Sequence, residues 1–171
     1  KTRDDLKASV ALSIVANGPS KFEGRKLGIV VTEGADVSVL NGLITALKKQ
    51  DASFEIIATE VTGVKVSDGS SKQFDQIIEG APSVLYDAVA ILATTEGAKL
   101  LLEKPATRDF VADAFVHCKY IGFNAAASPL LKNANIPLAN AVGSLKLDSS
   151  KDVSDYVAQL GNLRIWERFS T

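Results

Sequence analysis

The chain has 171 residues, a formal net charge of −1, and a composition that is 46% hydrophobic and 23% charged. This length suits one domain that buries about two-thirds of its unfolded surface. The near-zero net charge excludes the basic surface that nucleic acid or an anionic membrane requires. The longest apolar runs, such as Ser9–Ala16, are too short to span a bilayer. We therefore expect neither nucleic acid nor a membrane as a partner.

Two sulfur-residue counts bear on the origin of the chain. A single cysteine cannot form an internal disulfide, so it does not indicate a redox compartment, and a cytoplasmic and a secreted location both stay open. Methionine is absent, at position 1 as well, which indicates a processed chain or an excised domain. The function of such a chain can belong to a longer parent protein.

The first predicted element is a helix over residues 1–16. Its pattern is an apolar residue at every fourth position: Leu6, Val10 and Ile14. The glycine and proline of residues 17–20 end it. We assign residues 1–21 to a partly helical arm or linker, and residues 22–171 to the domain itself.

Strand patterns alternate with helix patterns along the rest of the chain. Strands are expected at Leu27–Thr32, Phe54–Val61, Asp87–Ala93, Tyr120–Phe123 and Ile136–Val142. Helices are expected at Val37–Lys49, Thr107–Cys118 and Val153–Leu160, and a short hairpin at Val64–Gly69. Strands separated by helices imply right-handed crossovers and a parallel sheet. The predicted fold class is α/β: a flavodoxin-like, doubly wound, mainly parallel sheet with helices on both faces.

The segment Tyr120–Leu131 carries the strongest suggestion of an active site. It predicts a buried strand, a sharp turn of small residues and a helix start, the shape on which many α/β enzymes mount a nucleophile. The turn itself carries Asn124 and Ala125, while the only cysteine, Cys118, lies upstream. The scaffold suits catalysis, but the nucleophile is missing.

The other predicted strand ends offer weaker signals. Glu33 and Asp36 follow the first strand and could act as acids, but a solvated turn carboxylate or a helix N-cap is the favoured interpretation. The segment Thr94–Ala98 places hydroxyls and one glycine at a helix start, yet it lacks the spacing of a dinucleotide motif and the lysine of a P-loop. Ser128 lacks the Gly-x-Ser-x-Gly pattern of a serine nucleophile.

Rare side chains were considered as sites as well. His117 and Cys118 are unique in the chain, but neighbours on a helix point about 100° apart and make a poor base–nucleophile pair. A zinc site would need carboxylates for its other ligands. A helix-end histidine and a half-buried cysteine are the favoured interpretations. Trp166 with Arg164 and Arg168 could form a cation–π cluster or a docking surface, although packing of the chain end is favoured.

Several short motifs, in this order and spacing, resemble a known family. They are Glu23–Lys26 leading into Leu27–Val31, Gly80–Ser83 with Asp87–Val89, and Trp166–Arg168. The chain resembles the C-terminal domain of large-subunit catalases, most of all their filamentous-fungal members. The resemblance covers residues 22–169, and the arm would join this domain to the helical region of the catalase core. That domain is in turn similar to the DJ-1/PfpI group of the class I glutamine amidotransferase-like fold.

The resemblance to the DJ-1/PfpI group implies that its catalytic positions are lost here. In that group an acidic residue follows the first strand and a cysteine sits at the elbow. Laying this chain on that pattern puts Val39 at the acidic position, and Ala125, or Asn124 with a slip of one residue, at the cysteine position. Cys118 does not inherit the role. We therefore expect no catalytic, cofactor-binding or metal-binding residue in this domain, and we keep Cys118 as a possible redox site.

The resemblance to catalases implies a non-catalytic accessory domain. The parent would decompose hydrogen peroxide to water and oxygen with a haem held in its core, and the domain would contact that core and neighbouring subunits of a homotetramer. Some DJ-1/PfpI relatives are holdase chaperones, so unfolded clients are a further expected partner, with Leu100–Leu102 or Ser9–Ala16 as apolar surface. One alternative is a residual DJ-1/PfpI-like small-molecule enzyme or redox sensor that uses Cys118. A second alternative is a flavin- or nucleotide-binding module.

Overall fold

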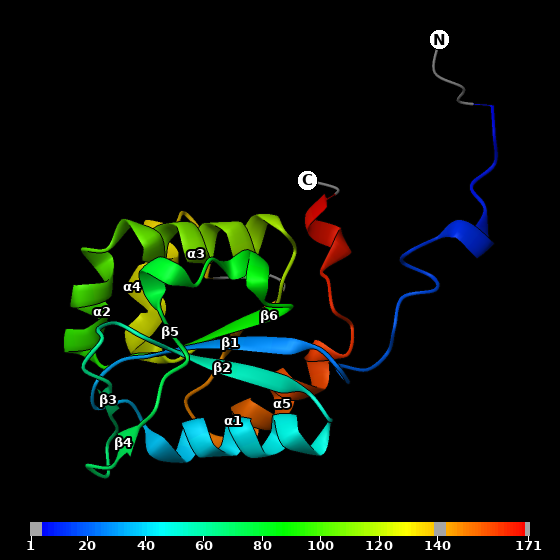
Figure 1. Cartoon of the computed structure of the whole chain (residues 1–171). Coiled ribbons are helices and arrows are strands. Elements are labelled where there is room, and N and C mark those ends of the chain that lie inside the picture. The colour runs from blue at the N-terminus through cyan, green and yellow to red at the C-terminus, as the bar shows by residue number, and fades with distance from the viewer. Residues whose placement is uncertain (1–4, 139–142, 170–171) are drawn as a thin grey trace.

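The sheet at the centre of the chain is parallel throughout. A computed structural model describes residues 5–138 and 143–169, and its main sheet has the strand order β5-β2-β1-β6-β7-β8 (Figure 1). The strands are β1 (Lys26–Val31), β2 (Ser53–Ala58), β5 (Gln76–Ile77), β6 (Ala88–Leu92), β7 (Ile121–Phe123) and β8 (Ser144–Lys146). Every pairing within it is parallel. Without the short edge strand β5, this order is that of flavodoxin-like folds.

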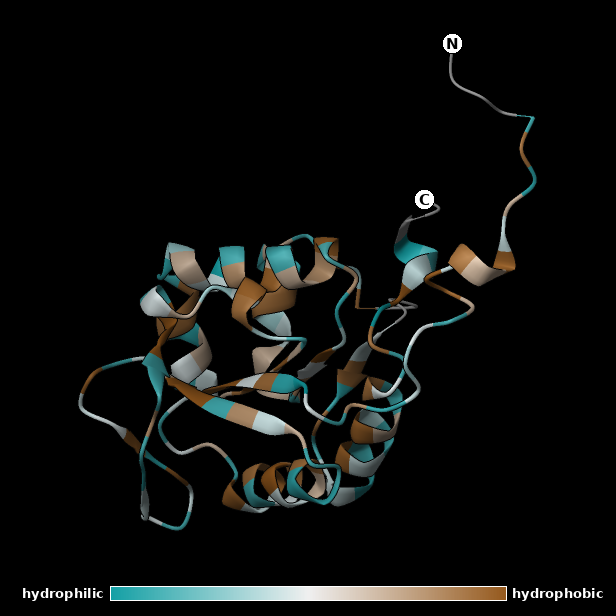
Figure 2. Ribbon diagram, turned by 45° about the vertical axis from the view of Figure 1, so that its right-hand side comes forward, coloured by the Kyte–Doolittle hydropathy of each residue, from teal (hydrophilic) through white to brown (hydrophobic). Residues whose placement is uncertain are grey.

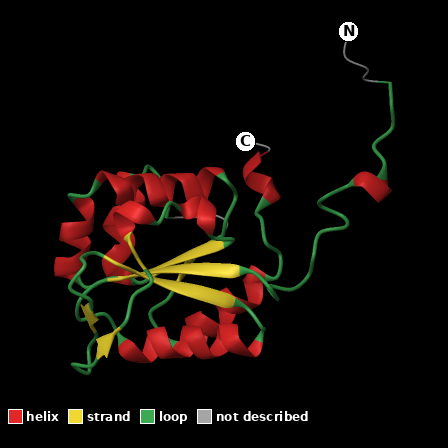
Figure 3. Cartoon of the chain, viewed as in Figure 1, coloured by secondary structure: helices red, strands yellow, loops and turns green. Residues whose placement is uncertain are grey.

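Helices cover both faces of this sheet, as Figures 1 and 3 show. On one face lie α1 (Val37–Lys49) and α5 (Ser150–Leu160), and on the other lie α2 (Thr95–Leu102), α3 (Pro105–Val116) and α4 (Ser128–Asn133). Each face has its own apolar cluster, so the sheet is buried on both sides. The predicted α/β, flavodoxin-like, doubly wound class is therefore confirmed. None of the helices described has the length and apolarity to cross a membrane.

The sequence of β1 shows how one strand serves both clusters. Ile29 packs in the cluster under α1 and α5, and Val30 in the cluster under α3 and α4, because successive side chains of a strand point to opposite faces. At Gly28 the ring of Tyr86 lies directly on the backbone. A Cβ atom there would be 2.6 Å from a ring carbon, so only glycine fits.

The remaining described elements are short. Strands β3 (Val64–Lys65) and β4 (Ser71–Lys72) pair antiparallel and confirm the predicted hairpin. The 3-10 turns are η1 (Val10–Leu12), η2 (Ile78–Gly80), η3 (Ser83–Leu85), η4 (Ala125–Ala127) and η5 (Trp166–Phe169). The turn η1 belongs to the arm, and η5 lies in the C-terminal segment beside the arm (Figure 1).

The predicted helix over residues 1–16 is wrong for the part that the structure describes. Among residues 5–16 the only helical element is the short turn η1, and their large apolar side chains are exposed. Figure 2 shows this segment as an arm that leaves the domain. The apolar residues of the arm have no surface of this domain to pack against. An isolated helix of about 16 residues is only marginally stable in water without such packing. The first buried side chain among the described residues is Phe22.

Two strand predictions also change. The last strand is β8, whereas Ile136–Leu138 lie outside any strand and residues 139–142 lie outside the described residues. Pro137 has no N–H to give to a ladder, and the N–H of Ile136 instead closes the end of α4 on the carbonyl of Leu131 at 2.9 Å. The second predicted strand is shorter than expected, because it ends at Ala58.

Candidate functional site

The crevice between the carboxyl ends of β1 and β6 is where this fold binds ligands. The strand order reverses there, and the neighbouring loops diverge. In this chain the crevice is bridged by two threonines. The N–H of Thr94 donates to Oγ1 of Thr32 at 2.8 Å, and the hydroxyl of Thr94 donates to the carbonyl of Glu33 at 3.1 Å. Both strand ends are thereby tied to each other.

The N-terminus of α2 is occupied by the same threonine. Oγ1 of Thr94 accepts a hydrogen bond from the N–H of Gly97 at 3.1 Å and so caps the helix. Gly97 lies so close to the first strand that a Cβ atom would be 2.2 Å from Oγ1 of Thr32. A phosphate site needs free N–H groups and room at this helix start. Here the group is capped and the room is filled.

The elbow after β7 is folded back onto its neighbouring strand. The side-chain amide of Asn124 donates to the carbonyl of Ala93 at 2.7 Å and accepts from its N–H at 3.0 Å. The backbone of Asn124 is extended, with φ −83° and ψ 165°. Among described non-glycine residues, positive φ values occur elsewhere and not at this turn. The strained backbone that exposes a nucleophile is therefore absent at both Asn124 and Ala125.

The first N–H of this turn is hydrogen-bonded to a carboxylate of the same chain. The N–H of Ala125 donates to Oδ1 of Asp148 at 2.8 Å. In acyl-transfer sites such an N–H is left to stabilise a developing oxyanion. Here that N–H is bonded to Asp148 instead. Val39, the other position that the resemblance marked, is a buried residue of α1 in the apolar cluster.

The carboxylates predicted as weak candidates have structural positions. Asp36 is the N-cap of α1, and its Oδ1 accepts from the N–H groups of Ser38 and Val39 at 2.7 and 3.2 Å. Glu33 is exposed in the turn before it. Ser128 is the first residue of α4 and stands directly before Pro129. The positions of Asp36 and Glu33 agree with the favoured interpretations of a helix N-cap and a solvated turn carboxylate.

His117 and Cys118 point into different surroundings. His117 is exposed at the end of α3, with its Nδ1 2.8 Å from the carbonyl oxygen of Asp113. Cys118 has a left-handed backbone with φ 56° and is only 2% exposed. Its thiol lies 3.8 Å from the carbonyl oxygen of Val116. Burial of this kind shields a thiol from oxidants, since reactive thiols are accessible thiolates.

The amino ends of the strands, at the opposite edge of the sheet, carry a second set of charged groups. Glu55 accepts a hydrogen bond from Lys26 at 2.7 Å and from the hydroxyl of Tyr86 at 2.8 Å. The hydrogen bond from Lys26 is the main reason that the pKa of Glu55 lies below its usual value. Burial raises the pKa of Tyr86, so it stays a neutral donor.

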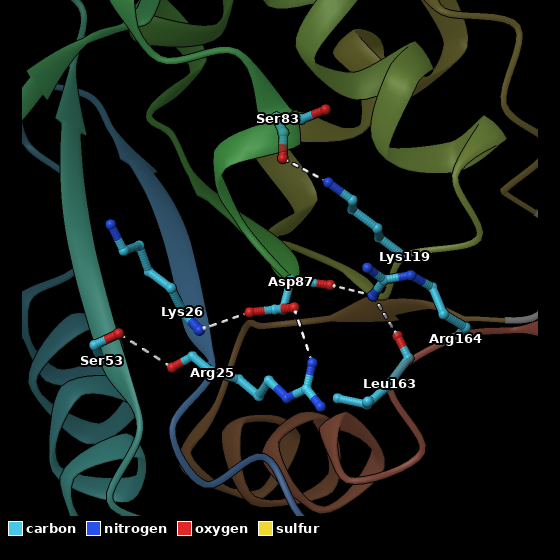
Figure 4. Close-up of polar contacts among 8 residues, drawn as sticks. All are labelled: Arg25, Lys26, Ser53, Ser83, Asp87, Lys119, Leu163 and Arg164. Atoms are coloured by element: carbon cyan, nitrogen blue, oxygen red, sulfur yellow. Dashed lines mark hydrogen bonds and ion pairs between the residues drawn. The ribbon is translucent and has the colours of Figure 1, made fainter. Parts of the chain in front are cut away.

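Lys119 is the unexpected residue at this end. Its side chain is 4% exposed, and its Nζ donates to the carbonyl oxygen of Ser83 at 2.6 Å (Figure 4). Burial, together with the nearby Arg164, lowers the pKa of Lys119 to about 8, although Asp87 and Asp113 act in the other direction. No carboxylate hydrogen bond to Nζ is recorded among the described residues.

The C-terminal segment is fastened beside Lys119 by arginines. Arg164 donates to the carbonyl oxygens of Asp87 and Leu163 at 2.9 and 3.0 Å (Figure 4). Arg168 donates to the carbonyl oxygen of Lys119 at 3.0 Å, and its guanidinium lies 4.2 Å from the ring centre of Phe115. The cation–π contact thus involves Phe115, a partner that the sequence did not indicate.

The described part of the chain holds no group of three or more His, Cys, Asp or Glu side chains arranged for a metal ion. The roles of Thr32, Asp148 and Lys119 were not predicted from the sequence. Thr32 and Thr94 could have been paired, since each follows a central strand of the predicted sheet. Asp148 and Lys119 gave no signal, because their partners are backbone groups far away in the chain.

The fold is similar to that of DJ-1 proteins. It resembles a solved structure of oxidised DJ-1 from Toxoplasma gondii with a TM-score of 0.66 and 15% identity, over 80% of this chain and 89% of that one. A cysteine-to-alanine mutant of a DJ-1 superfamily protein from Salmonella typhimurium gives a TM-score of 0.63 and 17% identity, over 80% and 88%. At such identities the likeness shows the fold alone.

The family itself is shown by sequence. The family model of the C-terminal domain found in long catalases matches residues 23–170, so the chain belongs to this family. It is 47% identical to Catalase C of Rhizobium meliloti over 98% of this chain, and 26% identical to Catalase HPII of Pseudomonas putida over 95%. It is 25% identical to Catalase-1 of the filamentous fungus Neurospora crassa over 66% of this chain. The chain spans about a quarter of the first two relatives, 24% and 22%.

Proposed function

We propose that this chain is a non-catalytic accessory domain of a haem catalase. The observation that supports it is the closed crevice, where Thr32, Thr94 and Asn124 use each other and the strand ends as hydrogen-bond partners. On this proposal Val39 and Ala125 are the vacated acidic and nucleophile positions of a DJ-1/PfpI-type ancestor. A domain without reacting groups contributes through its surface and its stability.

The parent, on the same proposal, decomposes hydrogen peroxide with a haem in its core, and this domain binds none. It stabilises a homotetramer by contacting the core and neighbouring subunits. The test compares the parent with a version that ends before residue 22. We expect the shortened parent to keep peroxide turnover per haem but to lose activity at a lower temperature. Equal thermal inactivation of the two proteins would rule out the stabilising role.

A holdase chaperone activity is the second part of the proposal. The observation that favours it is apolar surface: Leu100 is 49% exposed on α2 and Leu12 is 84% exposed in the arm. Thermal aggregation of an unrelated client, followed by light scattering with the domain added, tests it. Protection by both the wild type and Cys118→Ala, but not by an inert protein, means holding without thiol chemistry. Failure of both removes the chaperone role and leaves the accessory role.

A redox sensor or small-molecule enzyme that uses Cys118 is the first alternative. It needs an accessible thiolate, whereas this thiol is buried. Mass spectrometry after limited peroxide treatment distinguishes this alternative from the accessory-domain proposal. We expect no selective sulfenylation of Cys118, and its appearance would favour the sensor.

A flavin- or nucleotide-binding module is the second alternative. It would place a phosphate at the start of α2, where the capping hydroxyl of Thr94 already satisfies the N–H of Gly97. Titration with FMN or NADPH should give no saturable fluorescence change. A saturable change would support the alternative.

A further inference from the structure

One end of the domain presents apolar side chains on a rigid support. We call it the arm-side end and define it by Val84 and Leu85 of η3, Val116 at the end of α3, and Trp166 of the C-terminal segment. Val84 is 73% exposed and Val116 is 69% exposed, and Leu85 and Trp166 are partly or fully exposed as well. Large aliphatic residues with such exposure are open to a partner.

The three pieces of this end are held together by buried polar contacts. The bond from Lys119 to the carbonyl of Ser83 joins the end of α3 to η3 (Figure 4). The bonds from Arg168 to the carbonyls of Phe115 and Lys119 join the C-terminal segment to the end of α3. A surface fixed in advance loses little conformational entropy when a partner binds. The arm-side end is therefore held in one arrangement before any partner binds.

The arm leaves the domain at this same end, beside the C-terminal segment (Figure 1). A hollow of about 570 Å³ is lined on one side by Val15 and Pro19 of the arm and on the other by Arg164 and Trp166. The arm is itself rich in exposed apolar residues: Leu6, Val10, Leu12, Ile14 and Val15. One partner surface can cover the arm and the arm-side end together.

We propose that the arm-side end docks onto the catalase core that precedes the arm in the same chain. This inference rests on the proposed accessory role. In long catalases the family occupies the C-terminal position, and the chain covers only 24% of its Rhizobium relative, so the arm is the tether to the remainder. A short tether gives the attached core a high effective concentration at the end where the arm leaves. The apolar residues at the opposite end, Val61 and Leu100, lack this advantage.

The experiment uses the full-length parent and two matched double variants. Val84→Asp/Val116→Asp adds two charges to the arm-side end, and Val61→Asp/Leu100→Asp adds two charges to the opposite end. These side chains are exposed within the domain, so its own core is left intact. The measurement is the rate of tryptic cleavage in the arm, after Lys7 and Lys21, because undocking frees the arm.

We expect the arm-side variant to raise the cleavage rate about tenfold and the opposite-end variant to change it less than twofold. Equal rates for the wild type and the arm-side variant overturn the inference, and so does acceleration by the opposite-end variant alone. The parent that ends before residue 22 separates this failure from failure of the accessory role. If that shortened parent is less stable while the arm-side variant behaves as wild type, another face docks. If it is equally stable, the accessory role itself fails.

Discussion

The two ends of the parallel sheet handle their polar groups in opposite ways. At the carboxyl ends, short neutral side chains bond to each other and to the strand ends, as Thr94 does to Thr32 and Asn124 to Ala93. At the amino ends, long charged side chains donate to backbone carbonyls of other segments, as Lys119 does to Ser83 and Arg164 to Asp87. The first end is tied shut, and the second fastens a surface that still exposes apolar residues.

On the proposed accessory role, this difference suggests where the function of a fold goes when its chemistry is lost. The carboxyl ends of the strands are the usual ligand position of the fold. Here their donors and acceptors bond to each other, and on the proposed accessory role these ends contribute to stability. The opposite end keeps unburied apolar surface, which is a reason to bind a partner. Each prediction below alters one of the two ends.

The largest expected effect is at the closed crevice. Gly97→Ala places a Cβ atom 2.2 Å from Oγ1 of Thr32. The Thr32 hydroxyl cannot easily move away, because it accepts a hydrogen bond from the N–H of Thr94. Overpacking exceeds the gain in helix propensity, so we expect a loss of about 2–3 kcal/mol in the free energy of unfolding. Urea denaturation measures it. Gly42→Ala on α1 is the matched control: nothing lies within 4 Å of its Cβ position, so it should stabilise the domain. A stabilising Gly97→Ala would show that the crevice is loose.

The second effect tests the folded-back elbow. Asn124→Ala removes both hydrogen bonds to the backbone of Ala93 and leaves its N–H and carbonyl without these partners. We expect a loss of about 1–3 kcal/mol. Asn133→Ala, at an exposed position on α4, is the control and should change stability by less than about 0.5 kcal/mol. If the two variants unfold alike, the amide of Asn124 does not hold this end together.

The features that could be predicted from the sequence are those that depend on residues close together in the chain. The apolar runs of β1 and β6 and the periodicity of α1 are local patterns, and they sufficed for the sheet, its parallel sense and the fold class. Asp36 at the start of α1 was interpretable as a cap for the same reason. The composition of the elbow, with Asn124 and Ala125 in place of a cysteine, was likewise visible in the sequence.

What failed depended on contacts made at long range or not made at all. The arm had a helical pattern, but this domain offers it no surface, so the pattern remained unused. Lys119 reads as an ordinary surface residue until the fold brings Ser83 to it, 36 residues away in the chain. The closing of the crevice was not predicted either: Thr32 and Thr94 lie 62 residues apart, and pairing them requires that β1 and β6 be placed side by side first.

The third effect tests the charged end through pH. The pKa of Lys119 is about 8 in the folded chain and its usual value is 10.5. Between these values the unfolded chain binds more protons, so the free energy of unfolding rises with pH, by at most about 1.4 kcal/mol per pH unit. Lys119→Met should remove this rise in urea denaturation between about pH 8 and 10. Lys132→Met, on the exposed side of α4, should leave it unchanged. An unaltered slope in Lys119→Met would mean that Lys119 is solvated.

The smallest effect concerns the carboxylate that occupies the elbow N–H. Asp148→Ala removes the acceptor of Ala125 N–H, a bond of 2.8 Å at an exposed position. Water can replace the lost partner, so we expect a loss of only about 0.5–1 kcal/mol. The informative measurement is amide exchange at Ala125, which should become faster by about twofold to fivefold, because about 0.5–1 kcal/mol corresponds to such a ratio. Asp155→Ala, which removes an exposed carboxylate bonded to Lys151 on α5, should leave that amide unchanged.

The same Asp148→Ala variant also tests for hidden chemistry at the elbow. Because the turn lacks a nucleophile, the freed N–H should gain no hydrolytic activity toward activated esters. Activity in Asp148→Ala would show that the elbow had kept its chemistry behind this one carboxylate, and the contrast between the two ends would then be reversible.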